Sequence, residues 1–253
     1  MRDGKHLELE GNLRALNLSH MARNLEGVLR QALESGISCE EFLLELTVVE
    51  LQARADGRLA RRVREARFPL LKSLETFDLS AAPELDIRLL RELVGGDYIQ
   101  EHRNVIFLGR SGAGKTHLAT ALGVEACKHD YRTRFITCYG LVNELSEARQ
   151  ERFLQRVIQK YGRYDLLILD ELGYIPFSKE GAELLFQVLA ERHERGSVMI
   201  TTNLGFADWT QVFGDATMTA ALLDRLTHKA HIINCSWESY RLKQSLKEKG
   251  KRG

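Results

Sequence analysis

The stretch Gly109-Arg110-Ser111-Gly112-Ala113-Gly114-Lys115-Thr116 has the form G-x-x-x-x-G-K-T. Residues 104–108 precede it as a short apolar, partly β-branched run, which is typical of a buried strand. Residues 117–122 follow it and are rich in residues that favour a helix. A glycine-rich loop between a strand and a helix is the context of a phosphate-binding loop. The stretch therefore predicts an α/β fold that binds a nucleoside triphosphate, although a glycine-rich turn without a ligand could share this composition.

The residue types of this loop suit phosphate chemistry. Its glycines allow backbone N–H groups to surround a phosphate chain, and the helix that follows contributes the positive end of its dipole. We expect Lys115 to reach the β- and γ-phosphates and the Thr116 hydroxyl to hold Mg²⁺. The residues expected to bind the nucleotide are Gly109, Arg110, Ser111, Gly112, Ala113, Gly114, Lys115, Thr116 and His117.

Composition limits the class of protein. The chain has 253 residues, and 44% of them are hydrophobic, which is enough for one α/β domain and a small accessory domain. The formal net charge is +1, so binding to DNA would depend on local basic patches. The four cysteines form no C-x-x-C pair and favour reduced thiols. With no signal peptide and no apolar run of about 18 residues, we expect a cytoplasmic protein.

Residues 1–70 are predicted to form a small all-helical domain, because their apolar residues recur at helical spacing. Ser35-Gly36 should separate two helices, and Ser38 could cap the second. Arginines are frequent near the end of residues 1–70, where they could contact DNA or form a solvated face. Residues 71–253 are predicted to form the nucleotide-binding domain, which begins with a connector extending to residue 103.

From residue 104 onward, strands and helices alternate. Strands are predicted at 104–108, 134–137, 165–169, 198–201 and 230–233, with one long helix between the second and the third. Such alternation predicts a parallel sheet with helices on both faces.

The third predicted strand ends in Asp170-Glu171. In an open parallel sheet, the carboxyl ends of the strands form the ligand-binding edge, so this pair should lie beside the phosphate loop. We expect Asp170 to position Mg²⁺ through a water molecule and Glu171 to orient and deprotonate the attacking water. A polar strand end without a catalytic role is the alternative.

Two further residues are candidates for the same reaction. Asn203 follows the fourth predicted strand and could fix the attacking water and sense the γ-phosphate, or it could simply form a turn. Arg225 lies on a late helix and could supply a cation to the nucleotide of a neighbouring subunit. Alternatively, Arg225 forms a surface pair with Asp224, which would contribute little.

A basic stripe is predicted on the long helix between the second and third strands. At 100° per residue, five basic residues fall on one side of a continuous helix, opposite an apolar side. This stripe could contact the DNA backbone or be solvated. Its members are Arg149, Arg152, Arg156, Lys160 and Arg163. His228 and His231 lack a supporting Cys or acidic cluster, so a metal site is not expected there.

These motifs together resemble the DnaC/IstB group of AAA+ ATPases, and more specifically the IstB helpers of bacterial insertion sequences. The resemblance covers nearly the whole chain. It rests on the phosphate loop, on Phe206 and Trp209, and on the segments 66–72, 167–171, 182–187, 196–197, 201–203, 213–215, 221–226 and 238–242.

The resemblance implies an ATPase that uses ATP and Mg²⁺, assembles as a homo-oligomer on duplex DNA and helps a partner transposase choose its target. It also implies the sheet order 5-1-4-3-2, a finger role for Arg225 in a neighbour's site and DNA contact by the basic stripe. Too few residues follow Arg225 for a full helical lid, so no sensor-2 arginine can be assigned. A DnaC-type helicase loader is the main alternative, and a small-molecule kinase with the same phosphate loop is a weaker one.

Overall fold

The structure is a computed structural model that describes residues 4–240. Its packing divides the chain into two units, Met1–Arg61 and Arg62–Gly253. This division falls within a long helix, whereas the sequence pattern placed a domain boundary at residue 70, which stays a prediction.

The first unit is helical, as its apolar spacing indicates. It contains α1 (Gly4–Ala15), α2 (Ser19–Ser35) and most of α3 (Cys39–Ala66). The prediction of a single helix before Ser35 is wrong, because the chain turns at Asn17, whose φ is 59°. Gly36 ends α2 with a φ of 64°, and the Ser38 hydroxyl accepts a hydrogen bond from the Glu41 N–H at the start of α3. The predicted break and cap are therefore confirmed.

A small core holds the first unit together. Its buried apolar residues are Leu13, Met21, Ala22, Leu25 and Leu46. The start of α2 has no capping side chain of its own, and Glu50 of α3 supplies the missing acceptor for the backbone N–H groups of His20 and Met21. A carboxylate at a helix N-terminus is favourable, so Glu50 joins α2 to α3.

The second unit is built on a parallel five-stranded sheet. Its strands are β1 (Val105–Gly109), β2 (Thr133–Thr137), β3 (Leu166–Leu172), β4 (Ser197–Thr202) and β5 (His231–Cys235). They are ordered β2-β3-β4-β1-β5, and every neighbouring pair is parallel. The α/β fold class and the sheet order 5-1-4-3-2 are therefore confirmed.

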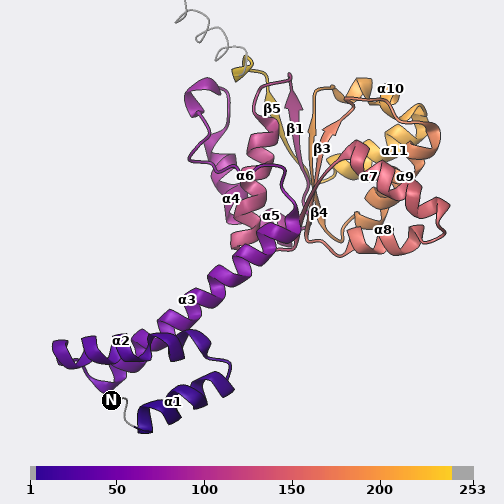
Figure 1. The fold of residues 1–253 in the computed structure, drawn as a ribbon. Helices are drawn as coiled ribbons and strands as arrows, with labels where there is room; N and C mark the ends of the chain where they lie inside the picture. Colours follow the sequence, from indigo (N-terminus) through magenta and orange to yellow (C-terminus); the bar gives the residue numbers. More distant parts are fainter. Residues whose placement is uncertain (1–3, 241–253) are drawn as a thin grey trace, which may run out of the picture. The chain divides into compact units, whose positions relative to one another are not determined.

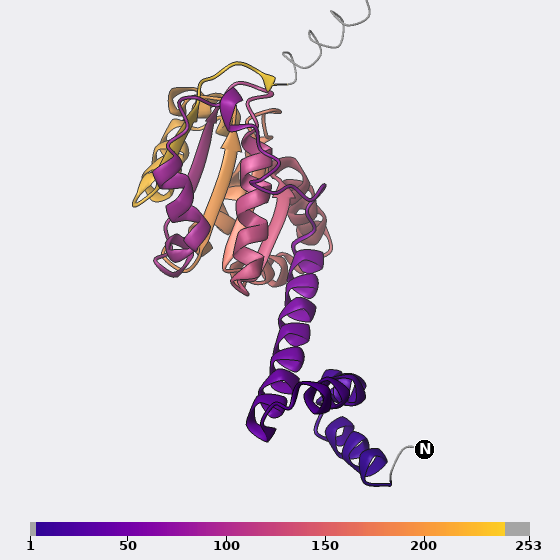
Figure 2. The ribbon, with the colours of Figure 1, turned by 90° about the vertical axis from the view of Figure 1, so that its left-hand side faces the viewer.

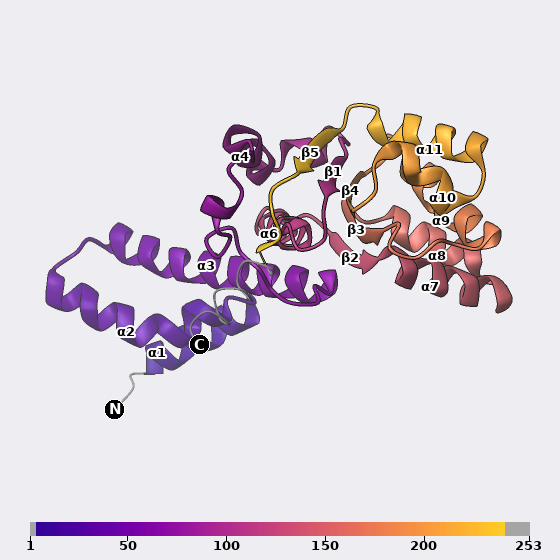
Figure 3. The same ribbon diagram turned by 90° about the horizontal axis from the view of Figure 1, so that it is seen from above.

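Helices cover both faces of the sheet (Figure 1). One face carries α4 (Ile87–Gly95), α5 (Asp97–Gln100) and α6 (Lys115–Lys128), and Figure 2 shows α6 running along it. The other face carries α7 (Cys138–Gln150), α8 (Leu154–Gly162), α9 (Lys179–Arg192), α10 (Trp209–Phe213) and α11 (Ala216–Thr227). Figure 3 shows the two helical layers on opposite sides of the strands. Strand residues alternate between the two cores, with Ile106 in one and Val105 and Phe107 in the other.

Short 3₁₀ helices occur at η1 (Leu79–Ala81) and η2 (Phe206–Asp208). Beyond β5 the structure describes residues 236–240, so the prediction of a missing lid falls partly outside the described residues. Within the described part of the chain, no helix combines the length and the apolar character needed to cross a membrane.

The prediction of one long helix between the second and third strands is wrong. The structure has α7 and α8 separated by a turn at Arg152, whose φ is 63°. Leu141 and Leu145 of α7 are buried against the same core as Val157 and Ile158 of α8. On one continuous helix these two apolar pairs would face directions about 180° apart, so only one of them could face the core. The chain turns because both pairs are buried.

Candidate functional site

The phosphate loop lies between β1 and α6 at the carboxyl edge of the sheet, as predicted. Gly109 approaches the neighbouring strand so closely that a Cβ atom on it would lie 2.1 Å from the Cys235 carbonyl oxygen. Gly114 caps α6 with a φ of 87°, and a Cβ there would lie 2.7 Å from the Phe77 ring. The loop therefore needs glycine at both positions, one for space and one for conformation.

A cavity of about 530 Å³ opens over this loop. Its volume falls in the range of small-molecule sites. Loop residues from Ser111 to His117 line it, together with Thr120 of α6, the ends of β3 and β4, the connector and the segment after β5. The remaining lining residues are Pro69, Leu70, Lys72, Thr76, Phe77, Asp78, Ala81, Glu171, Tyr174, Thr201, Thr202, Asn203, Trp237 and Tyr240.

Lys115 and His117 are both held by backbone carbonyls. The Lys115 ammonium donates to the carbonyl oxygens of Gly109 (2.7 Å) and Arg110 (2.8 Å), which keeps it folded over its own loop. One ring nitrogen of His117 lies 2.9 Å from the Ser73 carbonyl oxygen. His117 thus ties the first turn of α6 to the connector, while Arg110 and Ser111 are exposed.

Three elements bring hydroxyl and carboxylate groups together beside the cavity, which Thr116 and Thr201 line. The Thr116 hydroxyl at the start of α6 donates to Asp170 on β3, at 2.9 Å to one carboxylate oxygen. The Thr201 hydroxyl on β4 donates to the same oxygen. Asp170 is 4% exposed, so these hydroxyls compensate for the burial of its charge. The structure confirms that Thr116 and Asp170 lie together, and it adds Thr201, to which the sequence pattern assigned no role.

Glu171 has an unusual backbone conformation for a strand residue. Its φ is 61°, and the pairing of β3 with β4 shifts register between Leu169 and Leu172. The Glu171 N–H donates to the Thr201 hydroxyl (3.0 Å), and the side chain is exposed in the cavity. A left-handed conformation at a non-glycine residue is strained and is often found at functional sites. Without the register shift, Asp170 and Glu171 would point to opposite faces of the sheet.

Asn203 lies directly after β4 and lines the same cavity with an exposed side chain. It therefore shares the carboxyl edge with Glu171 and Lys115, as the predicted strand order requires. The structure records no hydrogen bond from its side chain to another described residue.

Part of the cavity wall was not predicted from the sequence. Phe77 and Lys72 come from the connector, which the sequence pattern marked only as a linker. Trp237, beyond β5, donates its indole N–H to the Ala113 carbonyl oxygen at 2.8 Å, and the Tyr240 N–H donates to the Gly112 carbonyl oxygen. The only available signal was the scarcity of tryptophan, since the chain has just two.

Two buried cysteines, Cys138 and Cys235, are unsuited to act as nucleophiles. Burial raises the pKa of the Cys138 thiol, and the carboxylates of Asp170 and Glu171 raise it further. Burial also raises the pKa of Cys235 to about 12, although Lys115 acts in the opposite direction. Both thiols are therefore protonated at neutral pH, and a thiolate is the reactive form.

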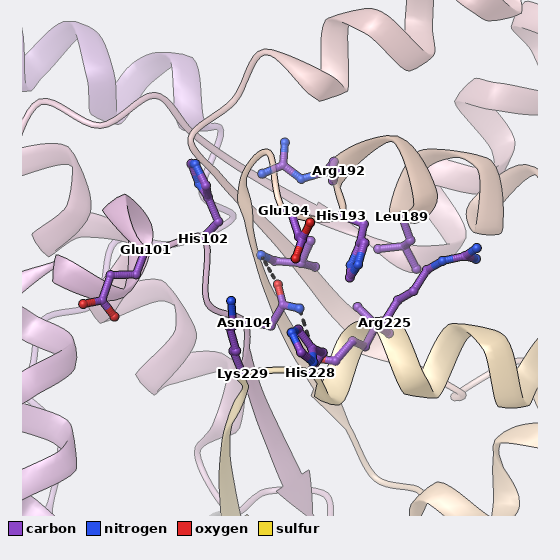
Figure 4. Close-up of a pocket in the computed structure, with 12 residues that line it drawn as sticks. Glu101, His102, Asn104, Leu189, Arg192, His193, Glu194, Arg225, His228 and Lys229 are labelled. Carbon is purple, nitrogen blue, oxygen red and sulfur yellow. Dashed lines mark hydrogen bonds between the residues drawn. The ribbon is translucent and has the colours of Figure 1, made fainter.

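Arg225 lies away from this cavity, at the other edge of the sheet. It borders a second cavity of about 230 Å³ with Asn104, Arg192 and His228 (Figure 4). Asn104 precedes β1 and donates to the Leu226 carbonyl oxygen at 3.0 Å, which fixes the end of α11 to the amino edge. The surface pair between Asp224 and Arg225 is not formed among the described residues. Arg225 therefore cannot reach the nucleotide cavity of its own subunit without rearrangement.

The basic stripe is divided by the turn between α7 and α8. Arg149 on α7 is paired with Glu180 at 2.7 Å, and Lys160 on α8 is paired with Glu144 at 2.7 Å. Burial raises the pKa of Glu144, but hydrogen bonds from Lys160 and Tyr161 outweigh it, so the pKa is lowered overall. The remaining members are exposed and have no ion pair among the described residues, namely Arg152, Arg156 and Arg163.

Residues 11–248 match the family described as IstB-like ATP binding protein. The chain is 40% identical over 240 residues to a protein of Pseudomonas aeruginosa named as an ATP-binding protein of insertion sequence IS21, covering 95% of this chain and 91% of that one. It is 39% identical over 232 residues to the corresponding protein of insertion sequence IS5376 from Geobacillus stearothermophilus, covering 90% and 91%.

Solved structures with the same fold are more distant in sequence. AMPPCP-bound DnaA from Aquifex aeolicus is 18% identical with a TM-score of 0.57, covering 72% of this chain and 56% of that one. The DnaC helicase loader is 20% identical with a TM-score of 0.50, covering 68% and 98%. At such identities the likeness concerns the fold alone.

Proposed function

The chain belongs to the IstB-like ATP-binding protein family, and from this premise we propose that it hydrolyses ATP to regulate DNA transposition. In this proposal the protein assembles on duplex DNA in the cytoplasm and helps the transposase of its own insertion sequence to select and use a target. The relatives named after insertion sequences support the link to transposition. The observation that carries the proposed chemistry is the Thr116–Asp170–Thr201 cluster, with Glu171 exposed beside it.

Lys115 would bind the β- and γ-phosphates within the loop of backbone N–H groups at the start of α6. Its ammonium now contacts two loop carbonyls, so it lies over the loop where phosphates would bind. The oxygen ligands of Thr116 and Asp170 fit Mg²⁺, which would neutralise charge on the phosphates when bound. The aromatic wall of Phe77 and Trp237 would face the apolar part of the nucleotide.

Glu171 would act as the general base. Its side chain is exposed in the cavity, whereas Asp170 is buried and accepts hydrogen bonds from the Thr116 and Thr201 hydroxyls, so of the two carboxylates Glu171 is the one placed to deprotonate the attacking water. Asn203, directly after the neighbouring strand β4, would hold this water and respond to the γ-phosphate. The two adjacent carboxylates can take these different roles because the pairing of β3 with β4 shifts register at the end of β3.

Arg225 would complete the site of a neighbouring subunit in a homo-oligomer. It lies at the opposite edge of the sheet from its own phosphate loop, which supports action in trans. Such an arginine can contribute roughly 10³–10⁵ in rate. Lys72 is the competing cation, because it lines the nucleotide cavity of the same subunit.

DNA would be bound through its backbone by the basic residues around α8. Arg152, Arg156 and Arg163 are exposed and available, whereas Arg149 and Lys160 would have to exchange their carboxylate partners for phosphates. Phosphate contacts release counterions, so the logarithm of affinity should fall linearly with the logarithm of salt concentration. Reversing the charge of Arg152 and Arg156 should flatten this slope by about 0.9 for each phosphate that is no longer neutralised.

The decisive experiment is ATP hydrolysis by Glu171→Gln, measured with and without duplex DNA. The variant should bind ATP normally and hydrolyse it about 10²–10⁴-fold more slowly, because an amide cannot accept the proton of water. It should also retain DNA longer in the ATP state. Normal turnover in this variant would remove Glu171 from the mechanism.

A mixing experiment tests the oligomeric site. Arg225→Ala and Lys115→Ala should each be inactive, whereas a mixture should recover activity at interfaces that combine an intact loop with an intact Arg225. Lys72→Ala serves as the control for a cation within the same subunit. Absence of recovery in co-assembled mixtures would exclude trans action.

A binding experiment tests the biological role. The Glu171→Gln protein with ATP and DNA should capture the transposase encoded by the same insertion sequence. Capture of a replicative helicase in its place would assign the protein to helicase loading.

A further inference from the structure

Arg225 rests on an aromatic ring. Its guanidinium carbon lies 4.9 Å from the centre of the Phe186 ring on α9. The Nη1 atom is buried and has no hydrogen-bond partner, and among the described residues no hydrogen bond or ion pair of Arg225 is recorded. In Figure 4 the side chain extends away from Asn104 and His228 and ends at the guanidinium. The ring is therefore the contact that defines the direction of this side chain.

Both helices are fixed where this contact forms. On α9, Leu185 and Val188 are fully buried, and the Arg192 guanidinium donates to the carbonyl oxygens of Tyr161 and Ser197, both at 2.7 Å. On α11, Leu222 and Leu226 are buried in the same core. The ring and the arginine thus project from two anchored helices, and the distance between them is set by the core.

The contact between the Arg225 guanidinium and the Phe186 ring is chemically suited to an arginine that later binds an anion. An aromatic face attracts a guanidinium electrostatically but accepts none of its in-plane hydrogen bonds in the way a carboxylate does. A carboxylate at position 186 would pair with the fork of N–H donors and occupy it. Phe186 holds the charge in place without accepting hydrogen bonds from these donors, so no carboxylate has to be displaced when the guanidinium binds phosphate oxygens.

We propose that Phe186 positions Arg225 for the nucleotide of the neighbouring subunit, an inference that rests on the proposed trans action of Arg225. An unrestrained arginine loses side-chain freedom when it binds, and prior restraint by the ring lowers that loss in the transition state. Phe186 is a positioning residue that acts through Arg225 in its own subunit. Its removal therefore impairs the subunit that donates the arginine and spares the subunit that binds the nucleotide.

The test uses mixtures of full-length subunits in which donor and acceptor are distinct. The donor carries Lys115→Ala and supplies Arg225, while the acceptor carries Arg225→Ala and supplies the nucleotide site. Adding Phe186→Leu to the donor should lower the kcat of the recovered activity about 5- to 30-fold, with the KM for ATP unchanged. Adding Phe186→Leu to the acceptor should leave the recovered activity unchanged.

Two further variants separate positioning from packing. Phe186→Tyr in the donor keeps the aromatic face and should restore kcat to within about twofold of the donor with Phe186 intact. Phe186→Met fills a similar volume without a ring and replaces Phe186→Leu if the latter fails to fold. Thermal unfolding of each variant checks that the fold is retained.

The outcomes are distinguishable. An equal decrease from the donor and the acceptor variants, or no decrease from the donor variant, overturns the positioning role while trans action by Arg225 stands. No recovery in co-assembled mixtures with Phe186 intact overturns both trans action and the positioning role. A decrease confined to the donor, with restoration by Phe186→Tyr, supports the inference.

Discussion

The carboxyl and amino edges of the sheet each carry a cavity with basic side chains, yet their chemistry is opposite. At the carboxyl edge, the N-terminus of α6 faces the cavity, with Lys115 beside it. At the amino edge, the cavity is lined by His193 and His228, which are the C-terminal caps of α9 and α11. The ions that a cavity favours depend on the charged side chains that line it. They also depend on whether a helix faces the cavity with its N-terminus or with its C-terminus.

The basic residues at the amino edge therefore have a structural explanation. Helix C-termini present unpaired carbonyl groups with partial negative charge, and cationic side chains are favourable beside them. Arg192 is the clearest case, because its guanidinium donates to backbone carbonyl oxygens and is 1% exposed. Burial lowers the pKa of Arg192, while Asp165 acts in the opposite direction.

Non-glycine residues with positive φ occur at both edges of the sheet, but for different reasons. At the carboxyl edge, Glu171 has a positive φ within the end of β3, where it exposes a candidate catalytic carboxylate. At the amino edge, His102, Glu194 and Lys229 have positive φ values at the ends of helices. Glycine is the usual residue just after the C-terminal end of a helix, where the chain reverses with a positive φ. The reversal of the chain alone therefore explains these three conformations.

The largest expected effect is on ATP affinity, and it is tested by replacing one lysine at each edge. Lys115→Ala should weaken ATP binding by about 10²–10⁴-fold, because the phosphates lose charge-assisted hydrogen bonds. Lys229→Ala should leave ATP affinity unchanged, although Lys229 also lines a cavity with basic residues. Titration with a fluorescent ATP analogue measures both affinities. Markedly weaker binding in Lys229→Ala would show that the amino edge also contributes to nucleotide binding.

The next effect concerns the stability of the amino edge. Arg192→Met should lower the free energy of unfolding by about 3 kcal/mol, because several buried carbonyl groups lose their donor. Arg195→Met is the matched control, since Arg195 is exposed and within the described residues pairs only with Glu191, and it should change stability by under about 1 kcal/mol. Denaturant unfolding followed by circular dichroism gives both values. Equal stability of the two variants would show that the Arg192 network contributes little.

A smaller effect is expected from the Thr201 hydroxyl at the carboxyl edge. Thr201→Val keeps the shape of the side chain but removes the donor to Asp170 and the acceptor for the Glu171 N–H. It should lower kcat about tenfold with little change in ATP affinity. Thr202→Val is the comparison, because Thr202 lines the same cavity but its hydroxyl bonds the Leu172 carbonyl oxygen and the Leu204 N–H instead of Asp170 and Glu171. Steady-state kinetics that fail to separate the two variants would argue against a role for Thr201 at the site.

The smallest effect concerns backbone strain. Glu194→Gly should raise the free energy of unfolding by about 0.5–1 kcal/mol without changing ATP hydrolysis, because glycine adopts positive φ more easily. Glu171→Gly relaxes the same strain at the carboxyl edge but should abolish hydrolysis because the carboxylate is removed. Paired measurements of unfolding and turnover distinguish them. If Glu194→Gly lowered turnover, the amino edge would have a functional role beyond the one described.

Much of the fold was predictable because its signals are local. The alternation of apolar strands with helices predicted the parallel sheet, and the phosphate loop predicted its own position between β1 and α6. The long helix after β2 was wrongly predicted because the apolar side set against the basic stripe took no account of Leu141 and Leu145. Leu141 and Leu145 lie on the side of a continuous helix that the basic stripe would occupy, so burial of both apolar sets required a turn at Arg152.

By itself, the sequence determined the phosphate loop, the acidic pair Asp170-Glu171 and the order of the strands, because these depend on short motifs and on a resemblance that spans the chain. Only the tertiary structure decided which distant residues surround them. Thr201 joins Asp170 through the pairing of β3 with β4, Phe77 and Trp237 close the cavity, and Phe186 meets Arg225 across two helices. Such contacts depend on how strands and helices pack, and packing joins residues whose spacing along the chain carries no periodic signal.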